Sequence, residues 1–168
     1  RGYTAEQVLA ELDKREADSR DFIRTQRAHA DIAVQFYPPE GVALEQAGPQ
    51  LNVRLVLRPT LPHPDLSYLV DGAPNPASGI RLELGRDDGR PVDFLEIDGT
   101  VTAAHSAQLE EALWQHLPDL RSIRQDQFGD YQDRTLVRHS HPLALTQLLL
   151  TYHLLRQYSD VAQIPFAP

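Results

Sequence analysis

The order in which the hydrophobic pattern changes along the chain is the strongest constraint on its fold. Apolar residues recur at helical spacing near the start, alternate with a period of two through the middle, and return to helical spacing near the end. Alternation with one polar face is typical of antiparallel strands. The pattern predicts a single α+β domain over residues 1–168. Its antiparallel sheet, of about four or five strands, is covered by an N-terminal helix and two C-terminal helices.

The first helix is predicted from Thr4 to about Arg27. Thr4 and Gln7 have the spacing of a capping box, in which the two residues satisfy each other's free backbone N–H groups at the helix start. The apolar residues that follow at helical spacing include Val8, Leu9, Leu12, Phe22 and Ile23. The opposite side carries charges of both signs, so it is predicted to be a solvated face and not a binding patch.

Four segments in the middle of the chain have strand periodicity, namely residues 32–36, 51–57, 80–84 and 92–97. Asp88-Gly89, between the last two, favours positive φ and predicts a type I′ hairpin turn. The neighbouring Asp87 is predicted to be a solvated carboxylate at the hairpin tip. Residues 121–138 are polar and mixed in charge, and they are predicted to wrap the surface.

Two helices are predicted after the sheet, over about residues 104–117 and 143–158. Apolar residues cover most of the circumference of the second helix, so it is predicted to be buried on two sides. It lies either between the sheet and another helix, or with half of its surface against a partner. Leu150 and Leu154 widen its apolar face and are candidate contact residues for that partner.

Composition excludes several classes of chemistry. The chain has no cysteine, which rules out disulfides, thiolate metal sites and cysteine nucleophiles. Lys14 is the single lysine, so Schiff-base chemistry is confined to that position. The net charge is −8, and the basic residues do not gather into a stripe, so no nucleic-acid partner is predicted. No apolar run reaches the roughly 18 residues of a membrane span, and no cofactor is predicted.

No motif indicates a nucleotide site or a compartment. Gly85, Gly89 and Gly99 are separate turn residues, not a glycine-rich run that opens a helix, so nucleotide binding is not predicted. The chain begins at Arg1 and has no methionine. A leader sequence or an upstream domain that precedes Arg1 is therefore one open alternative. A cytoplasmic protein and a processed exported protein both fit. The preference for arginine over lysine fits a GC-rich bacterial genome.

The proline-rich segment 59–78 is a predicted binding surface. It is the longest irregular stretch, and long loops in compact domains are often functional. Tyr37 lies where Pro38-Pro39 ends the first predicted strand. It is a further candidate contact residue, because amphipathic rings often anchor interfaces. The expected partner is another protein or a second copy of the chain, bound through this segment or the last helix. The candidate contact residues of the segment are His63, Asp65, Leu66 and Tyr68.

A metal-dependent enzyme is the alternative function. His139, His141 and His153, with Asp130 and Asp133 nearby, are residue types that bind zinc or iron, and His-x-His can supply two ligands from an extended segment. This alternative requires the three histidines to converge on one ion. A small periplasmic carrier or binding protein is the second alternative.

The order of elements resembles the RWD and ubiquitin-conjugating-like fold. Tyr37-Pro38-Pro39 resembles the Tyr-Pro motif of the RWD family, and Ile97-Asp98-Gly99, followed by the helix through Leu109 and Leu113, resembles its turn and second helix. The resemblance implies a docking role, and the absence of cysteine excludes thioester transfer. With no catalytic motif present, the chain is predicted to be a non-catalytic protein-interaction module that acts in docking or as a chaperone.

Overall fold

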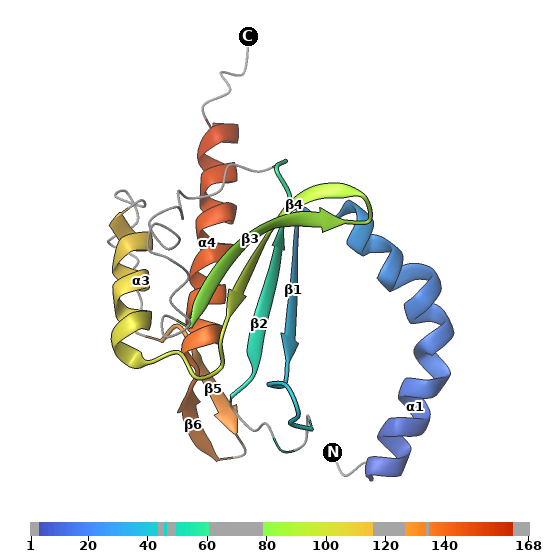
Figure 1. The fold of residues 1–168 in the computed structure, drawn as a ribbon. Coiled ribbons are helices and arrows are strands. Elements are labelled where there is room, and N and C mark those ends of the chain that lie inside the picture. Colours follow the sequence, from blue (N-terminus) through green and yellow to red (C-terminus); the bar gives the residue numbers. More distant parts are fainter. Residues whose placement is uncertain are drawn as a thin grey trace.

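The structure is a computed structural model that describes residues 4–43, 46, 50–60, 79–115, 127–133 and 135–162. The elements in chain order are α1 (Ala5–Asp18), a π-helical turn η1 (Ser19–Ile23), a 3-10 helix η2 (Arg24–His29), β1 (Ile32–Tyr37), β2 (Asn52–Leu57), β3 (Ile80–Asp87), β4 (Arg90–Ile97), α3 (Ala103–Gln115), β5 (Asp130–Asp133), β6 (Leu136–His139) and α4 (His141–Ala162). Figure 1 shows α4 beside the four-stranded sheet, α3 next to α4, and α1 on the opposite side of the molecule. The predicted α+β class is confirmed.

Among the helices that the structure describes, none has the length and apolar character needed to cross a membrane.

The four-stranded sheet has the order β1-β2-β4-β3, and all of its strand pairs are antiparallel. Alternation along β2 places Val53, Leu55 and Leu57 on one face, as the period of two predicts. The strands β3 and β4 form the predicted hairpin, in which Asp88 and Gly89 have φ values of 50° and 76°. A type I′ turn requires positive φ at both central residues, so the predicted turn is confirmed.

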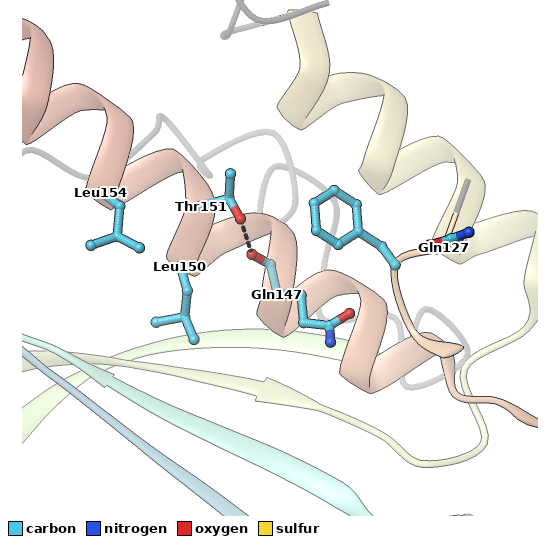
Figure 2. A pocket seen from close by; sticks show the side chains of 6 residues that line it. Gln127, Gln147, Leu150, Thr151 and Leu154 are labelled. Carbon is cyan, nitrogen blue, oxygen red and sulfur yellow. Dashed lines mark hydrogen bonds between the residues drawn. The ribbon is translucent and has the colours of Figure 1, made fainter. Parts of the chain in front are cut away.

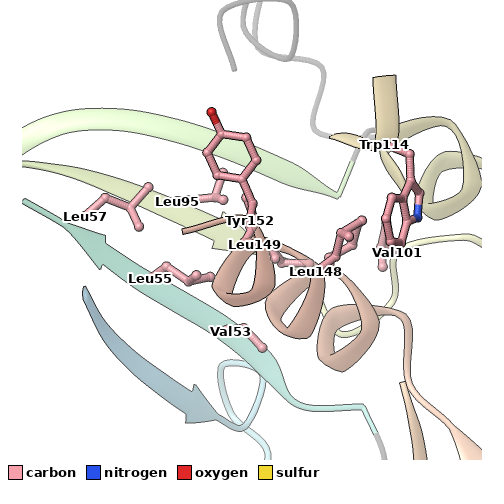
Figure 3. Close-up of a cluster of buried hydrophobic side chains, with 11 residues drawn as sticks. Val53, Leu55, Leu57, Leu95, Val101, Trp114, Leu148, Leu149 and Tyr152 are labelled. Atoms are coloured by element: carbon pink, nitrogen blue, oxygen red, sulfur yellow. The ribbon is translucent and has the colours of Figure 1, made fainter. Parts of the chain in front are cut away.

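The hydrophobic core lies between this face of the sheet and α4 (Figure 3). On α4, Leu145, Leu148 and Leu149 are at most 2% exposed, and Tyr152 continues the same buried face. Full burial of a side chain of this size contributes about 1.5–3 kcal/mol. The other members of the core cluster are Val53, Leu55, Leu57, Leu95, Ile97, Val101 and Trp114. The last helix is therefore buried along the sheet, whereas its Leu154 is 72% exposed.

Residues 130–139 form the antiparallel pair β5 and β6, where the sequence predicts only a surface excursion. Each strand has four residues, and most of their side chains are exposed, so no apolar alternation marks them. Gly129 precedes the hairpin with a φ of +86°, and a Cβ at this position would lie 2.6 Å from the Ser140 carbonyl oxygen. Close backbone contact, and not apolar burial, therefore positions this hairpin beside the start of α4.

The N-terminal helical segment does not cover the sheet. The elements α1, η1 and η2 form one continuous helical arm from Ala5 to His29. Its predicted capping box is confirmed, because the Thr4 hydroxyl accepts from the Gln7 N–H and the Gln7 side chain accepts from the Thr4 N–H. Every described side chain of α1 is exposed, and Figure 1 shows α1 arching away from the strands. Thus α4 covers the sheet, whereas α1 does not.

Replacing Leu148 with Ala tests the placement of the core. We expect the free energy of unfolding to fall by about 3 kcal/mol, because the change leaves a cavity in a packed interior. The matched control is Leu154→Ala on the exposed side of the same helix, which should change stability by less than about 0.5 kcal/mol. Urea unfolding followed by the fluorescence of the buried Trp114 measures both. Equal losses for the two variants would contradict the placement of α4.

Candidate functional site

An exposed apolar stripe runs along the helical arm. Val8 and Leu9 each lie three or four residues from Leu12, so the three side chains share one face of α1. They are 47–60% exposed, and Phe22 and Ile23 in η1 are 69% and 62% exposed. Single exposed apolar residues are ordinary, whereas several on one element form a candidate interaction surface. We call these five residues the arm stripe.

The arm gains little stability from the domain that carries it. An isolated helix shorter than about 12–15 residues is marginal in water, and helices in proteins depend mainly on packing of their apolar face. The 14 residues of α1 are supported by the capping box and by exposed ion pairs such as Arg15 with Glu11 at 3.2 Å. An exposed pair of this kind contributes only about 0.3–0.5 kcal/mol. The arm stripe therefore adds little to the stability of the helix while it is exposed to solvent.

The neighbouring strand β1 extends this uncovered apolar surface. It is an edge strand of the four-stranded sheet, and its Val34 and Phe36 are paired with Leu55 and Val53 on the core face. Both side chains are nevertheless more than a third exposed. An edge strand also presents unpaired backbone groups, which makes it a natural place for another chain to bind. Both the arm and this edge therefore present apolar side chains to solvent.

A buried arginine joins the end of the arm to the sheet. Arg58 lies directly after β2 and is 6% exposed. Its Nε donates to the Ala30 carbonyl oxygen at 2.9 Å, and its Nη2 donates to the Arg27 carbonyl oxygen at 3.2 Å. The same Nη2 lies 3.0 Å from Asp87 Oδ2 at the end of β3. The last carbonyls of a helix lack intrahelical partners and form the negative end of its dipole, so a guanidinium suits this position.

Asp87 completes this junction by binding a second arginine. Its Oδ1 accepts from Arg27 Nη2 at 3.0 Å, and Arg90 donates to the Ala28 carbonyl oxygen at 2.9 Å. The hydrogen bond from Arg27, with the charges of Arg27 and Arg58, lowers the pKa of the Asp87 carboxyl, while burial opposes this. Asp87 is therefore not the solvated carboxylate that the sequence predicts. We call Arg27, Arg58, Asp87 and Arg90 the arginine anchor.

Tyr37, a predicted contact residue, is held on the face of the sheet opposite α4. Its hydroxyl donates to Glu96 Oε2 at 2.5 Å, and Arg54 donates to the other oxygen of that carboxylate. Burial, followed by the hydrogen bond and charge of Glu96, raises the pKa of Tyr37 to about 12. The Tyr37 hydroxyl is therefore protonated at neutral pH and is used within the sheet.

Leu150 and Leu154, the candidate contact residues of the last helix, line a pocket of about 410 Å³ (Figure 2). Phe128, which precedes β5, also lines it. The Thr151 hydroxyl donates to the Gln147 carbonyl oxygen at 2.8 Å, so this polar group is bonded within the helix. The pocket is open and combines apolar side chains with the amides of Gln127 and Gln147. The predicted contacts His63, Asp65, Leu66 and Tyr68 lie outside the described residues.

The structure brings together two of the three candidate metal ligands. His139 Nε2 lies 3.2 Å from His141 Nδ1, and His139 Nδ1 lies 2.9 Å from Asp130 Oδ1. Burial, with the charge of His139 adding to it, lowers the pKa of His141. His153 is buried against Tyr152 on α4, about 18 Å further along the helix axis at 1.5 Å per residue. Within the described residues, no group of three or more His, Cys, Asp or Glu side chains is arranged to hold a metal ion.

Comparison with known proteins finds a partial similarity to phosphoribulokinases. No protein-family model matches the chain. A phosphoribulokinase of Synechocystis sp. is 29% identical over 113 residues, which cover 59% of this chain and 34% of the relative. The chloroplastic phosphoribulokinase of Spinacia oleracea is 26% identical over 113 residues, which cover 59% of this chain and 28% of the relative. The chain thus spans about a third of the length of the curated relatives it matches.

Replacing Asp87 with Asn keeps the shape of the side chain and removes its charge, which tests the arginine anchor. We expect a loss of about 2 kcal/mol in unfolding free energy at pH 7, because a hydrogen bond to a charged group contributes about 1.5–3 kcal/mol. The folded-state pKa of Asp87 is lowered. Its contribution is therefore present above the unfolded pKa of about 3.9 and is lost as the pH falls through the folded-state pKa.

The stability difference between the natural protein and Asp87→Asn should consequently shrink on acidification below about pH 4. Chemical denaturation across a pH series measures this difference. Asp13→Asn, at an exposed position of α1, is the matched control and should leave stability nearly unchanged. A difference between Asp87→Asn and the natural protein that stays constant with pH would rule out the ion pairs as its cause.

Proposed function

We propose that this chain is a non-catalytic docking module of a phosphoribulokinase-like kinase, and that its helical arm binds another part of that kinase. The observation that carries the proposal is the arm stripe, whose side chains from Val8 to Ile23 are 47–69% exposed. A surface of this kind is the expected site of a protein partner. The similarity to two phosphoribulokinases supports a kinase as the context.

The absence of a glycine-rich phosphate loop from the sequence supports a non-catalytic role. Catalysis of phosphoryl transfer depends on groups that position and neutralise the phosphates, and this chain has no glycine-rich run that opens a helix. The matched region is about a third of each relative, so most of such a kinase lies outside it. The phosphate-binding groups are therefore expected elsewhere in that kinase.

The arginine anchor suits this docking role. It holds the last turn of the arm to the β3–β4 hairpin through Arg58 and Asp87, while the arm stripe remains exposed. A fixed starting direction reduces the conformational freedom that the arm loses on binding. The anchor is therefore a positioning device for the docking surface.

The paired substitution Leu9→Glu with Leu12→Glu tests the proposal in the polypeptide that carries this chain. Both side chains are exposed, so the fold should be retained, whereas burial of two carboxylates in an apolar interface is strongly unfavourable. The tagged polypeptide is purified from its own cells, and phosphoribulokinase activity is measured in the purified material. We expect that activity to fall at least about tenfold, which corresponds to about 1.4 kcal/mol of docking free energy.

The matched control is Leu84→Glu, which places the same charge at an even more exposed leucine on β3. The control should keep the phosphoribulokinase activity of the natural protein. An inactive natural preparation, or full activity in the arm variant, would contradict the proposal. Circular dichroism of each variant confirms that the comparison is made between folded proteins.

A further inference from the structure

His139 and His141 present two ring nitrogens to each other at the junction of β6 and α4. His139 Nε2 lies 3.2 Å from His141 Nδ1, and the rings meet edge to face with centroids 4.8 Å apart. We propose that this pair binds a divalent transition-metal ion of the zinc class. The proposed site is separate from the arm stripe and does not depend on the proposed kinase partner.

The separation of the two nitrogens fits metal coordination. Imidazole nitrogens bind Zn²⁺ at about 2.0–2.1 Å in a tetrahedral arrangement, so two nitrogens on one ion lie about 3.3 Å apart. The 3.2 Å between His139 Nε2 and His141 Nδ1 is close to that value. A bound ion would take the place of the hydrogen bond that joins the two nitrogens in the metal-free protein.

Asp130 provides the second contact that a metal-binding histidine usually makes. Its Oδ1 lies 2.9 Å from His139 Nδ1, and the two residues are register partners across the β5–β6 hairpin. A carboxylate at Nδ1 holds the ring proton on that nitrogen and leaves the lone pair of Nε2 available. The nitrogen that faces His141 is therefore the one prepared to bind a cation.

The backbone around the pair is fixed by one contact across the base of the hairpin and one contact to α4. The Ser140 N–H donates to the Gly129 carbonyl oxygen at 2.9 Å, and the Gly129 N–H donates to Gln147 Oε1 at 2.7 Å. Gly129 has a φ of +86°, and a Cβ there would lie 2.6 Å from the Ser140 carbonyl oxygen, so this backbone approach requires glycine. A prearranged site of this kind loses less conformational entropy when the ion binds.

The protein supplies two ligands to the proposed site. In the part of the chain that the structure describes, no third His, Cys, Asp or Glu joins them around one ion. The His139 and Asp130 side chains are 41% and 38% exposed, so water has access to the remaining coordination positions. A bound ion would tie the last residue of β6 to the first residue of α4, and it would stabilise the hairpin by linkage.

Calorimetric titration of Zn²⁺ into the tag-free protein at neutral pH tests the site. We expect saturable binding of one ion per chain, and its loss in His139→Ala and in His141→Ala. Asp130→Asn should weaken binding by about 10- to 100-fold, the usual effect of removing the partner of a metal-bound histidine. His29→Ala, an exposed histidine at the end of η2, is the matched control and should bind Zn²⁺ like the natural protein.

A second measurement guards against variants that fail to fold. Zn²⁺ should raise the melting temperature of the natural protein and of His29→Ala, and it should leave that of His139→Ala unchanged. No saturable binding to the natural protein would overturn the proposal. Zn²⁺ binding by His139→Ala and His141→Ala as tight as that of the natural protein would also overturn it.

Discussion

The packing of α4 against the sheet is the contact on which the rest of the structure depends. Leu145, Leu148 and Leu149 are buried almost completely against β2 and β4, and each contributes about 1.5–3 kcal/mol through burial of apolar surface. This helix covers the middle of the sheet and leaves Val34 and Phe36 of the edge strand β1 more than a third exposed. Burial in the core thus determines which apolar surface remains for a partner.

The helical arm combines a firm attachment with an uncovered face. Arg58 and Asp87 hold its last turn beside the β3–β4 hairpin, and their charges are compensated at short range where water has little access. The stripe of Val8, Leu9 and Leu12 remains open to solvent. An exposed helix of this length is only marginally stable, because helices in proteins depend mainly on packing of their apolar face. In the proposed docking role, burial of this stripe against a partner would stabilise the arm.

The predictable parts of the fold are those with a local pattern. Alternation located the four strands, Asp88-Gly89 located the hairpin turn, and Thr4 with Gln7 located the start of α1. The β5–β6 hairpin has no apolar alternation, since its short strands are held by backbone contact. The anchor joins Arg58 to Asp87, 29 residues away, and no spacing rule relates residues so far apart. Nor does a helical pattern show whether its apolar face meets the same domain or another one.

Hydrogen exchange of the α1 amides tests whether a partner stabilises the helical arm. In the chain alone, these amides should exchange far faster than those of β2, because the exposed helix opens readily to solvent. Addition of the rest of the proposed kinase should slow their exchange and leave the β5–β6 amides unchanged. Slow exchange of the α1 amides in the chain alone, or no change when the kinase part is added, would contradict the account.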